Sequence, residues 1–184
     1  RLFKNRVGID LTWYKTNSVN QLLQLELAAP SGFDRQYINA GNIQNTGVEL
    51  TLNLGVIRKE TGLNWDITVN YAKNNPKVVE LHPDIKQAFL GGGYGRTAGP
   101  LVQEGGKFGD LYSEGWKRDA QGRLVVDASG KPVGSGAGGT LVGNYNPDFM
   151  LGFTNTFTLN RLSLNILIDG RFGGVMTSGT EANL

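Results

Sequence analysis

Apolar and polar residues alternate with a period of two along five segments of the chain. The pattern is clearest over 47–54, where Val and Leu fill the even positions and Gly, Glu, Thr and Asn fill the odd ones. This period places successive side chains on opposite faces of a β-strand. The same alternation runs over 6–13, 63–71, 149–159 and 162–168. No long window has a helical period, so the sequence predicts an all-β protein.

The connections between these segments differ regularly in length. The segments 55–62 and 160–161 are short links, whereas 17–38 and 74–148 are long ones. If the strands run antiparallel in chain order, both short links lie at one end of the sheet and both long links at the other. Short turns at one end and long loops at the other are typical of bacterial outer-membrane β-barrels.

Two interpretations of the alternation compete, because an apolar strand face can contact either lipid or a protein core. A soluble β-sandwich has the same period. The apolar faces carry no charge within the strands, and the opposite faces carry many Asn, Thr and Ser residues. This distribution favours a membrane barrel with a wet lumen. The charged residues that we expect to face the lumen are Asp10, Glu49, Asp66, Asp169 and Arg171.

Composition excludes several classes of function. The 184-residue chain has no Cys, one His and a net charge of +2. The lack of Cys excludes disulfides, thiolate metal sites and cysteine nucleophiles. The charges are scattered, which argues against a nucleic-acid partner. No carboxylate pair or His-based constellation is spaced for catalysis. We therefore expect no enzyme activity, no cofactor and no metal site.

The Gly-rich segment 74–147 is too long for a plain loop, so we expect it to contain structure of its own. Residues 119–123 (DAQGR) and 127–131 (DASGK) repeat one turn pattern, which predicts a small β-hairpin. The motif at 93–98 matches a dinucleotide fingerprint, but Gly99 and Pro100 follow it and exclude the required helix. Tyr94, Tyr112 and Trp116 are candidate ligand-binding residues, since aromatic rings suit sugars. We favour the alternative that they pack a small core of the insertion, because a Gly-rich segment needs such anchors to become ordered.

Four segments resemble, in sequence order, motifs of SusC/RagA-like TonB-dependent outer-membrane transporters. Residues 39–50 (NAGNIQNTGVEL) resemble the family's N-x-G-x-x-x-N-x-G-x-E segment, and 5–16 (NRVGIDLTWYKT) resemble the preceding barrel strand. Residues 143–152 (GNYNPDFMLG) resemble the strand entry G-N-x-x-P-x-(F/Y)-x-x-G, and 168–174 (IDGRFGG) the strand exit D-x-R-x-G-G. The motif glycines Gly41 and Gly47 are expected to relieve the backbone at strand entry.

The resemblance implies a 22-stranded barrel with an N-terminal plug, in the outer membrane of a Gram-negative bacterium. It implies import of oligosaccharides or peptides, with a SusD-like surface lipoprotein as partner and with TonB acting through an N-terminal region absent from this chain. We favour oligosaccharides. The chain is then a late barrel section: strands in 1–73 with an external loop at 17–38, the external insertion 74–147, and strands in 148–184.

An isolated section of a barrel lacks partners for its apolar face and its sheet edges. We therefore expect this chain to self-associate when it is separated from the rest of the barrel and from the plug. The alternative from the residues alone is a soluble β-sandwich module that binds carbohydrate or protein.

Overall fold

The computed structural model describes residues 2–26, 32–33, 35–83, 85–90, 98–136 and 138–178. Within them the chain has no helix, and every strand pair of known register is antiparallel. The predicted all-β, antiparallel class is confirmed. Among these residues, no helix is long and apolar enough to span a membrane. The strands are β1 (Val7–Glu26), β2 (Arg35–Ile57), β3 (Leu63–Glu80), β4 (Gln87–Phe89), β5 (Gly99–Gln103), β6 (Asp110–Ser113), β7 (Thr140–Asn144), β8 (Phe149–Leu159) and β9 (Leu162–Phe172).

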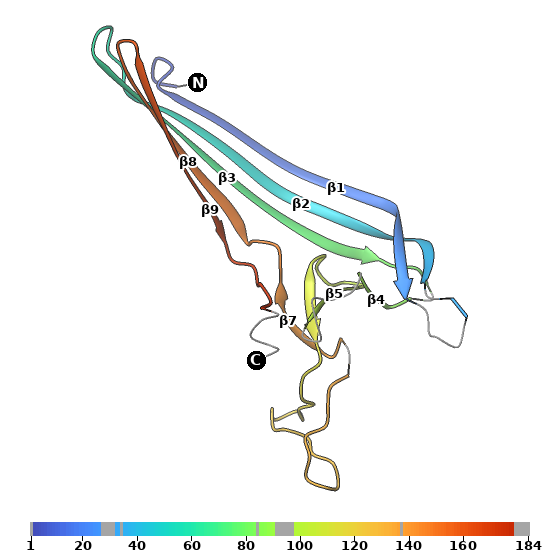
Figure 1. Cartoon of the computed structure of the whole chain (residues 1–184). Helices are drawn as coiled ribbons and strands as arrows, with labels where there is room; N and C mark the ends of the chain where they lie inside the picture. The colour runs from blue at the N-terminus through green and yellow to red at the C-terminus, as the bar shows by residue number, and fades with distance from the viewer. Residues whose placement is uncertain are drawn as a thin grey trace. The chain divides into compact units, whose positions relative to one another are not determined.

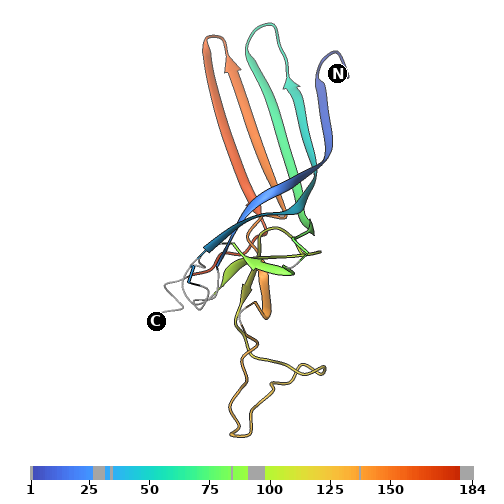
Figure 2. The same cartoon turned by 90° about the vertical axis from the view of Figure 1, so that its right-hand side faces the viewer.

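The chain divides into two compact units. Unit 1 comprises Arg1–Thr16, Asn45–Asn75 and Pro147–Gly173. It holds most of a five-stranded sheet in the order β1-β2-β3-β8-β9 (Figure 1). The turns that join β2 to β3 and β8 to β9 lie at the same end of this sheet (Figure 2).

A third short turn, which the sequence pattern did not reveal, precedes β1. Leu2 and Val7 exchange two backbone hydrogen bonds, of 2.8 and 3.1 Å, across it. Phe3, Lys4 and Asn5 turn the chain there with positive φ.

The register of unit 1 keeps like side chains together. β3 pairs with β8 from Leu63 opposite Leu159 to Ala72 opposite Met150. β8 pairs with β9 from Leu159 opposite Leu162 to Phe149 opposite Phe172. Because each strand alternates and the registers match, most apolar residues lie opposite apolar residues on one face and most polar residues opposite polar ones on the other, with exceptions such as Asn155 opposite Ile67 and Leu167 opposite Thr154.

The strands are longer than the alternation predicted. Segment 17–38 was expected to be a loop, but β1 continues to Glu26 and β2 already begins at Arg35. β3 likewise extends past the expected boundary at residue 74 and ends at Glu80. The alternation ends near Lys15 because polar residues then interrupt the apolar parity at Asn17 and Gln21, and Leu22 lies on the other parity. Side-chain bonds such as that from Gln44 Nε2 to Asn17 Oδ1 (3.0 Å) accompany the continued strand pairing.

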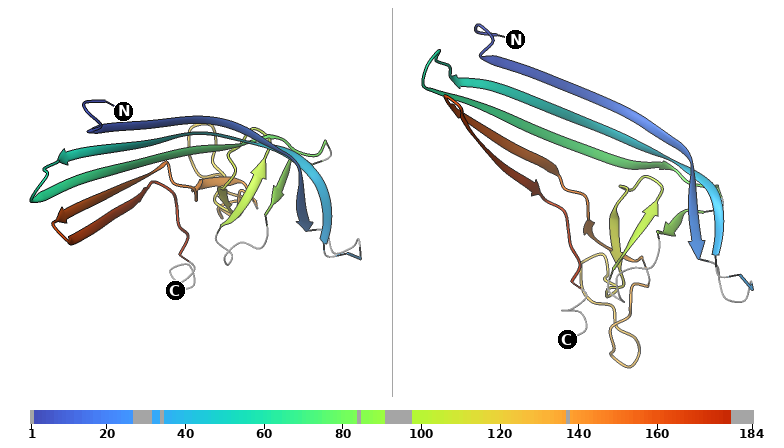
Figure 3. Two further views of the ribbon diagram at one scale, coloured as in Figure 1. Left: turned by 90° about the horizontal axis from the view of Figure 1, so that it is seen from above. Right: turned by 45° about the horizontal axis from the view of Figure 1, so that its top comes forward.

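Unit 2 comprises Asn17–Gln44, Pro76–Asn146 and Gly174–Leu184, and it has its own small core. Its four short strands form a sheet in the order β4-β5-β6-β7 (Figure 3). The buried apolar residues are Val78, Leu81, Ala88, Leu101, Val102 and Leu111. Backbone bonds from Val78 to Gly106 and from Gly105 to Val78, both 2.9 Å, attach the end of β3 to the loop after β5. Segment 74–147 thus contains structure of its own.

Candidate functional site

The polar face of the sheet in unit 1 carries a network of side-chain hydrogen bonds between strands. Three threonine hydroxyls each donate to an asparagine Oδ1 on a neighbouring strand: Thr51 to Asn70 (3.0 Å), Thr68 to Asn53 (2.9 Å) and Thr156 to Asn165 (2.7 Å). Such pairs hold the strands in register and leave a hydrophilic surface. This surface is the wall that the sequence predicted for a lumen.

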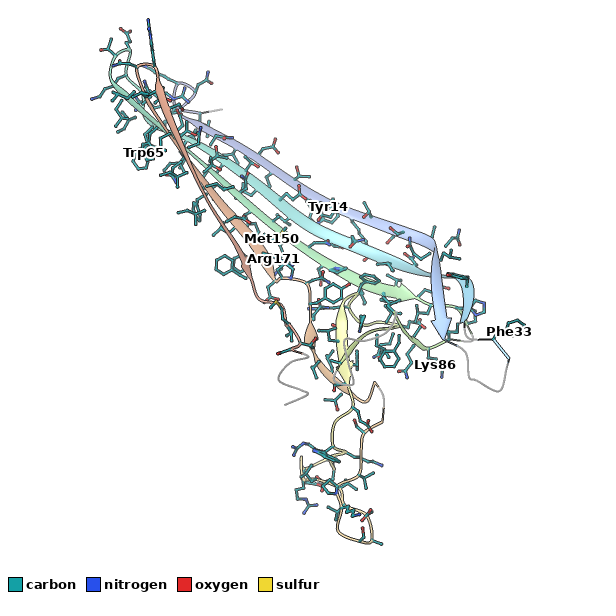
Figure 4. The ribbon with its side chains drawn as sticks, in the orientation of Figure 1. Tyr14, Phe33, Trp65, Lys86, Met150 and Arg171 are labelled. Carbon is teal, nitrogen blue, oxygen red and sulfur yellow. The ribbon has the colours of Figure 1, made fainter. Side chains whose placement is uncertain are left out.

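All five charged residues predicted for the lumen belong to this polar face. Glu49 and Asp169 line one hollow of about 260 Å³, beside the buried Gly152. Asp66 lines a second hollow. Asp10 is exposed and lies two residues after Gly8 on β1, so it has the same orientation as Gly8, which faces Asn53. Arg171 lies opposite Met150 at the far end of β9 (Figure 4) and forms no ion pair with a described carboxylate.

The second hollow contains an arginine that sequence reasoning missed. Arg58 Nη2 lies 2.8 Å from Asp66 Oδ1. Its guanidinium folds back over Gly55, where an added Cβ would collide with Nε. Both charged side chains are about half exposed, so the pair contributes only about 0–1 kcal/mol to stability. The available signal was a glycine on the polar side of β2, three residues before an arginine in a turn.

The opposite face of unit 1 is apolar and uncovered by the described residues. Leu11, Trp13 and Ile168 are each more than 60% exposed. The aromatic rings pair at two levels of the sheet: Trp65 stacks on Phe157 at 5.6 Å, and Phe149 on Phe172 at 4.7 Å. Figure 4 shows Trp65 close to the end with the short turns.

One polar residue interrupts this apolar face. Asn155 lies opposite Ile67 and Ile166, and its Oδ1 accepts a hydrogen bond from Trp65 Nε1 at 3.3 Å. The bond satisfies the indole N–H and one amide oxygen, which lowers the cost of having both groups on an apolar surface.

The insertion contains the predicted pair of turns, and they are confirmed as hydrogen-bonded loops. Asp119 Oδ1 accepts from the backbone N–H of Gln121 and of Arg123, each at 2.9 Å. Asp127 Oδ1 accepts from Ser129 (2.8 Å) and Lys131 (3.0 Å) in the same way. Gly122 and Gly130 close the turns with φ of 81° and 83°. Each Asp therefore fixes its own three-residue loop.

Three backbone hydrogen bonds connect the segments beside these turns in a closed cycle. Val125 N–H donates to Lys117 O, Val133 N–H to Val125 O, and Lys117 N–H to Val133 O, at 2.8 to 2.9 Å. We refer to residues 116–134 as the ring hairpin. Each of its three segments pairs with the other two, which gives the hairpin a defined backbone without a large core.

Acid should loosen the two turns of the ring hairpin independently, each when its own aspartate is protonated. Backbone and side-chain bonds from Arg123 lower the pKa of Asp119 below 3.8, and bonds from Ser129 and Lys131 lower the pKa of Asp127. A lowered pKa means that the turn is favoured above pH 3.8 and loses this contribution as the pH falls through the shifted value. Amide NMR shifts of Gln121 and Arg123 should therefore titrate with a midpoint below 3.8.

The two turns serve as controls for each other in this titration. Asp119→Asn keeps an acceptor oxygen but removes the ionisable group. It should abolish the titration of the first turn and leave the second unchanged. A midpoint at or above 3.8 in the wild type would contradict the hydrogen-bonded carboxylates.

The structure describes two of the three candidate ligand-binding aromatic residues and places them in different surroundings. Trp116 is 57% exposed on the ring hairpin, opposite Gly134, so it lies outside the core of unit 2. Tyr112 is partly buried in β6 between Gly99 and Leu141, and burial, followed by the nearby Asp110, raises its phenol pKa. Tyr94 lies outside the described residues. Trp116 is thus the better placed of the two described rings for contact with a ligand.

Asp110, which lies two residues before Tyr112 in β6, is a structural residue. It is 8% exposed, and its carboxylate accepts from the Lys107 N–H (2.9 Å) and from Asn144 Nδ2 (2.8 Å). These bonds tie the start of β6 to the end of β7 and satisfy the buried charge. Among the described residues, no three His, Asp or Glu side chains come together as a metal site.

Comparisons with known proteins identify the class to which this architecture is similar. No protein-family model matches the chain. TonB-dependent receptor P3 of Formosa agariphila is 25% identical over 204 residues, covering 100% of this chain and 20% of the relative. TonB-dependent receptor P26 of the same organism is 27% identical over 189 residues, covering 94% and 19%. The chain thus spans about a fifth of the length of these relatives.

Solved structures show the same class of fold. The RagAB peptide transporter superposes with a TM-score of 0.68 at 20% identity, covering 91% of this chain and 19% of that one. The RagAB peptide importer in the open-open state gives 0.62 at 18% identity, covering 90% and 18%. The fold of this chain is that of the matching section of these RagAB structures. The resemblance to SusC/RagA-like TonB-dependent transporters that the four motifs indicated is confirmed.

Proposed function

We propose that this chain is a wall section of a TonB-dependent importer in the outer membrane of a Gram-negative bacterium. The apolar face of unit 1 contacts lipid, and the polar face lines the lumen. The observation that carries this proposal is the contrast between the two faces. One exposes residues such as Leu11 and Trp13, whereas the other is covered by Thr–Asn bonds and charged groups.

The aromatic pairs support the placement in the membrane. Phe149 and Phe157 are eight positions apart on β8, and each stacks on an aromatic ring of a neighbouring strand. At about 3.3 Å per residue and a tilt of about 40°, their separation along the membrane normal is roughly 20 Å. This is close to the height of an outer-membrane apolar band between its aromatic girdles, which is about 25 Å.

In this proposal the end with the short turns faces the periplasm, and the ring hairpin belongs to the external surface. The transported nutrient is an oligosaccharide, with Trp116 as one contact, and a SusD-like lipoprotein covers the outer side. The full barrel has 22 strands and encloses a plug on which TonB acts. Separated from the rest of the barrel, this chain self-associates through its apolar face, because unpaired apolar surface of this extent is costly in water.

Tryptophan fluorescence of the full-length protein in vesicles tests the proposal. Brominated lipids should quench Trp13 and Trp65, whereas Trp116 should keep its emission and respond to added oligosaccharide. Trp→Phe substitution at each position, one at a time, isolates each contribution by difference. Equal quenching of all three, or none at Trp13 and Trp65, would contradict the orientation. Quenching without an oligosaccharide response at Trp116 would contradict only the ligand contact.

A further inference from the structure

The hollow at the end of the polar face nearest the short turns is a candidate binding site. It has a volume of about 380 Å³. Gly8 leaves it open, because no side chain extends from this part of β1, whereas the Arg58 side chain covers Gly55. Its polar side chains come from β2, β3 and the turns before β1 and after β2: Asn5, Arg6, Asn53, Arg58, Asp66 and Thr68.

The charges in this hollow do not cancel. Arg58 forms an ion pair with Asp66 at 2.8 Å. No described carboxylate pairs with Arg6, which is exposed at the start of β1. The lining of the hollow therefore includes two arginines and one aspartate, and only Arg58 forms an ion pair with a described carboxylate. By contrast, the neighbouring hollow is lined by Glu49 and Asp169 and by no cation.

One neutral side chain of the hollow, that of Asn53, presents a hydrogen-bond donor. Thr68 Oγ1 donates to Asn53 Oδ1 at 2.9 Å, which leaves the Asn53 amide nitrogen on the side toward Gly8. Guanidinium groups match a carboxylate geometrically, since their planar donors can form two parallel hydrogen bonds with its oxygens. An amide N–H beside them adds a further donor to the same anion.

We propose that this hollow binds a carboxylate group. The inference rests on the proposed function, since the hollow then lies at the periplasmic end of the lumen. The carboxylate is either a side chain from another part of the same polypeptide or a free acidic solute passing through the lumen. Arg6 supplies the unmatched charge, and the ion pair with Asp66 holds Arg58 over Gly55.

The experiment uses the full-length protein that contains this chain, in detergent at low ionic strength. Arg6→Gln removes the unmatched charge, and Lys59→Gln is the control, with the same charge change in the same turn region but outside the hollow. Glutarate binding is measured by calorimetry, and the thermal midpoint is measured without added anion. If the carboxylate is a free solute, glutarate binds, and Arg6→Gln weakens it about tenfold or more while Lys59→Gln does not.

If the carboxylate belongs to the polypeptide itself, glutarate does not bind. Arg6→Gln then lowers the thermal midpoint relative to Lys59→Gln, and added salt reduces the difference. The proposal is overturned if glutarate does not bind and Arg6→Gln has the same or a higher midpoint than the control, because loss of an unmatched cation relieves repulsion. Heat-modifiable gel migration reports the closed barrel separately. A closed barrel with neither response contradicts the carboxylate site alone, whereas absence of a barrel contradicts the proposed function as well.

Discussion

Ile166→Arg is expected to destabilise the assembled barrel by about 1–3 kcal/mol, between the cost of an arginine at the bilayer midplane and its cost near the interface. Ile166 lies opposite Asn155 on the apolar face, between the levels of the two aromatic stacks. Its side chain has no cover from the described residues and is 43% exposed. In lipid, the guanidinium loses its hydration, and this loss produces the cost.

The next residue is the matched control. Leu167 is also apolar and is 66% exposed, but it lies opposite Thr154 on the polar face. Leu167→Arg should therefore change the unfolding free energy by less than about 0.5 kcal/mol. Both variants are compared by urea unfolding of the full-length protein in vesicles, with heat-modifiable migration as the signal. Similar losses from the two variants would show that the faces do not have opposite surroundings.

The faces of the sheet could be predicted from sequence because alternation is a local property of each strand. Trp65 and Asp66 are adjacent in sequence and therefore lie on opposite faces. In the observed register, the apolar Trp65 lies opposite Phe157 and the polar Asp66 opposite Thr156. The repeated Asp-x-x-Gly turns were equally predictable, since the Asp side chain bonds to the backbone of its own loop. Both features depend on contacts within a few residues or on a fixed period.

The strand ends could not be predicted in this way. Beyond Lys15 apolar and polar residues of β1 no longer alternate, because Asn17 and Gln21 interrupt the apolar parity and Leu22 lies on the polar one, although the strand continues to Glu26. Backbone hydrogen bonds do not depend on side-chain polarity, and a sequence pattern does not record them. The same limit explains why the turn between Leu2 and Val7 was not recognised.

The interactions that shape the polar face join residues that no fixed sequence period relates. Arg58 covers Gly55 and reaches Asp66, and Tyr14 covers Gly47 on the neighbouring strand. The motif suggested that Gly41 and Gly47 both relieve the backbone. Gly41 does have a φ of 86°, but Gly47 has no left-handed φ, and its role is to make room for a ring. A single sequence does not reveal such a partner before the register is known.

Gly47→Ala is expected to destabilise the barrel by about 1–3 kcal/mol, the range for overpacking a filled site. Gly47 is buried, and a Cβ built on it would overlap Cζ, Cε1 and the hydroxyl oxygen of Tyr14. The ring must then leave the sheet surface or the strands must separate, and either change loses contacts. Urea unfolding of the full-length protein measures the effect.

Gly8→Ala tests whether the loss comes from the tyrosine ring or from a general intolerance of alanine on this face. Gly8 also lies on the polar side of the sheet without a left-handed φ, but its nearest neighbour to an added Cβ is Asn53 Cβ, at an ordinary 3.5 Å. It should therefore be tolerated. In the Tyr14→Ala background, Gly47→Ala should cost much less, with a coupling of about 0.5–3 kcal/mol between the two positions. Equal losses of unfolding free energy in Gly8→Ala and Gly47→Ala would contradict the idea that contact between the Tyr14 ring and Gly47 sets how β1 packs on β2. Additive losses from Gly47→Ala and Tyr14→Ala would contradict it as well.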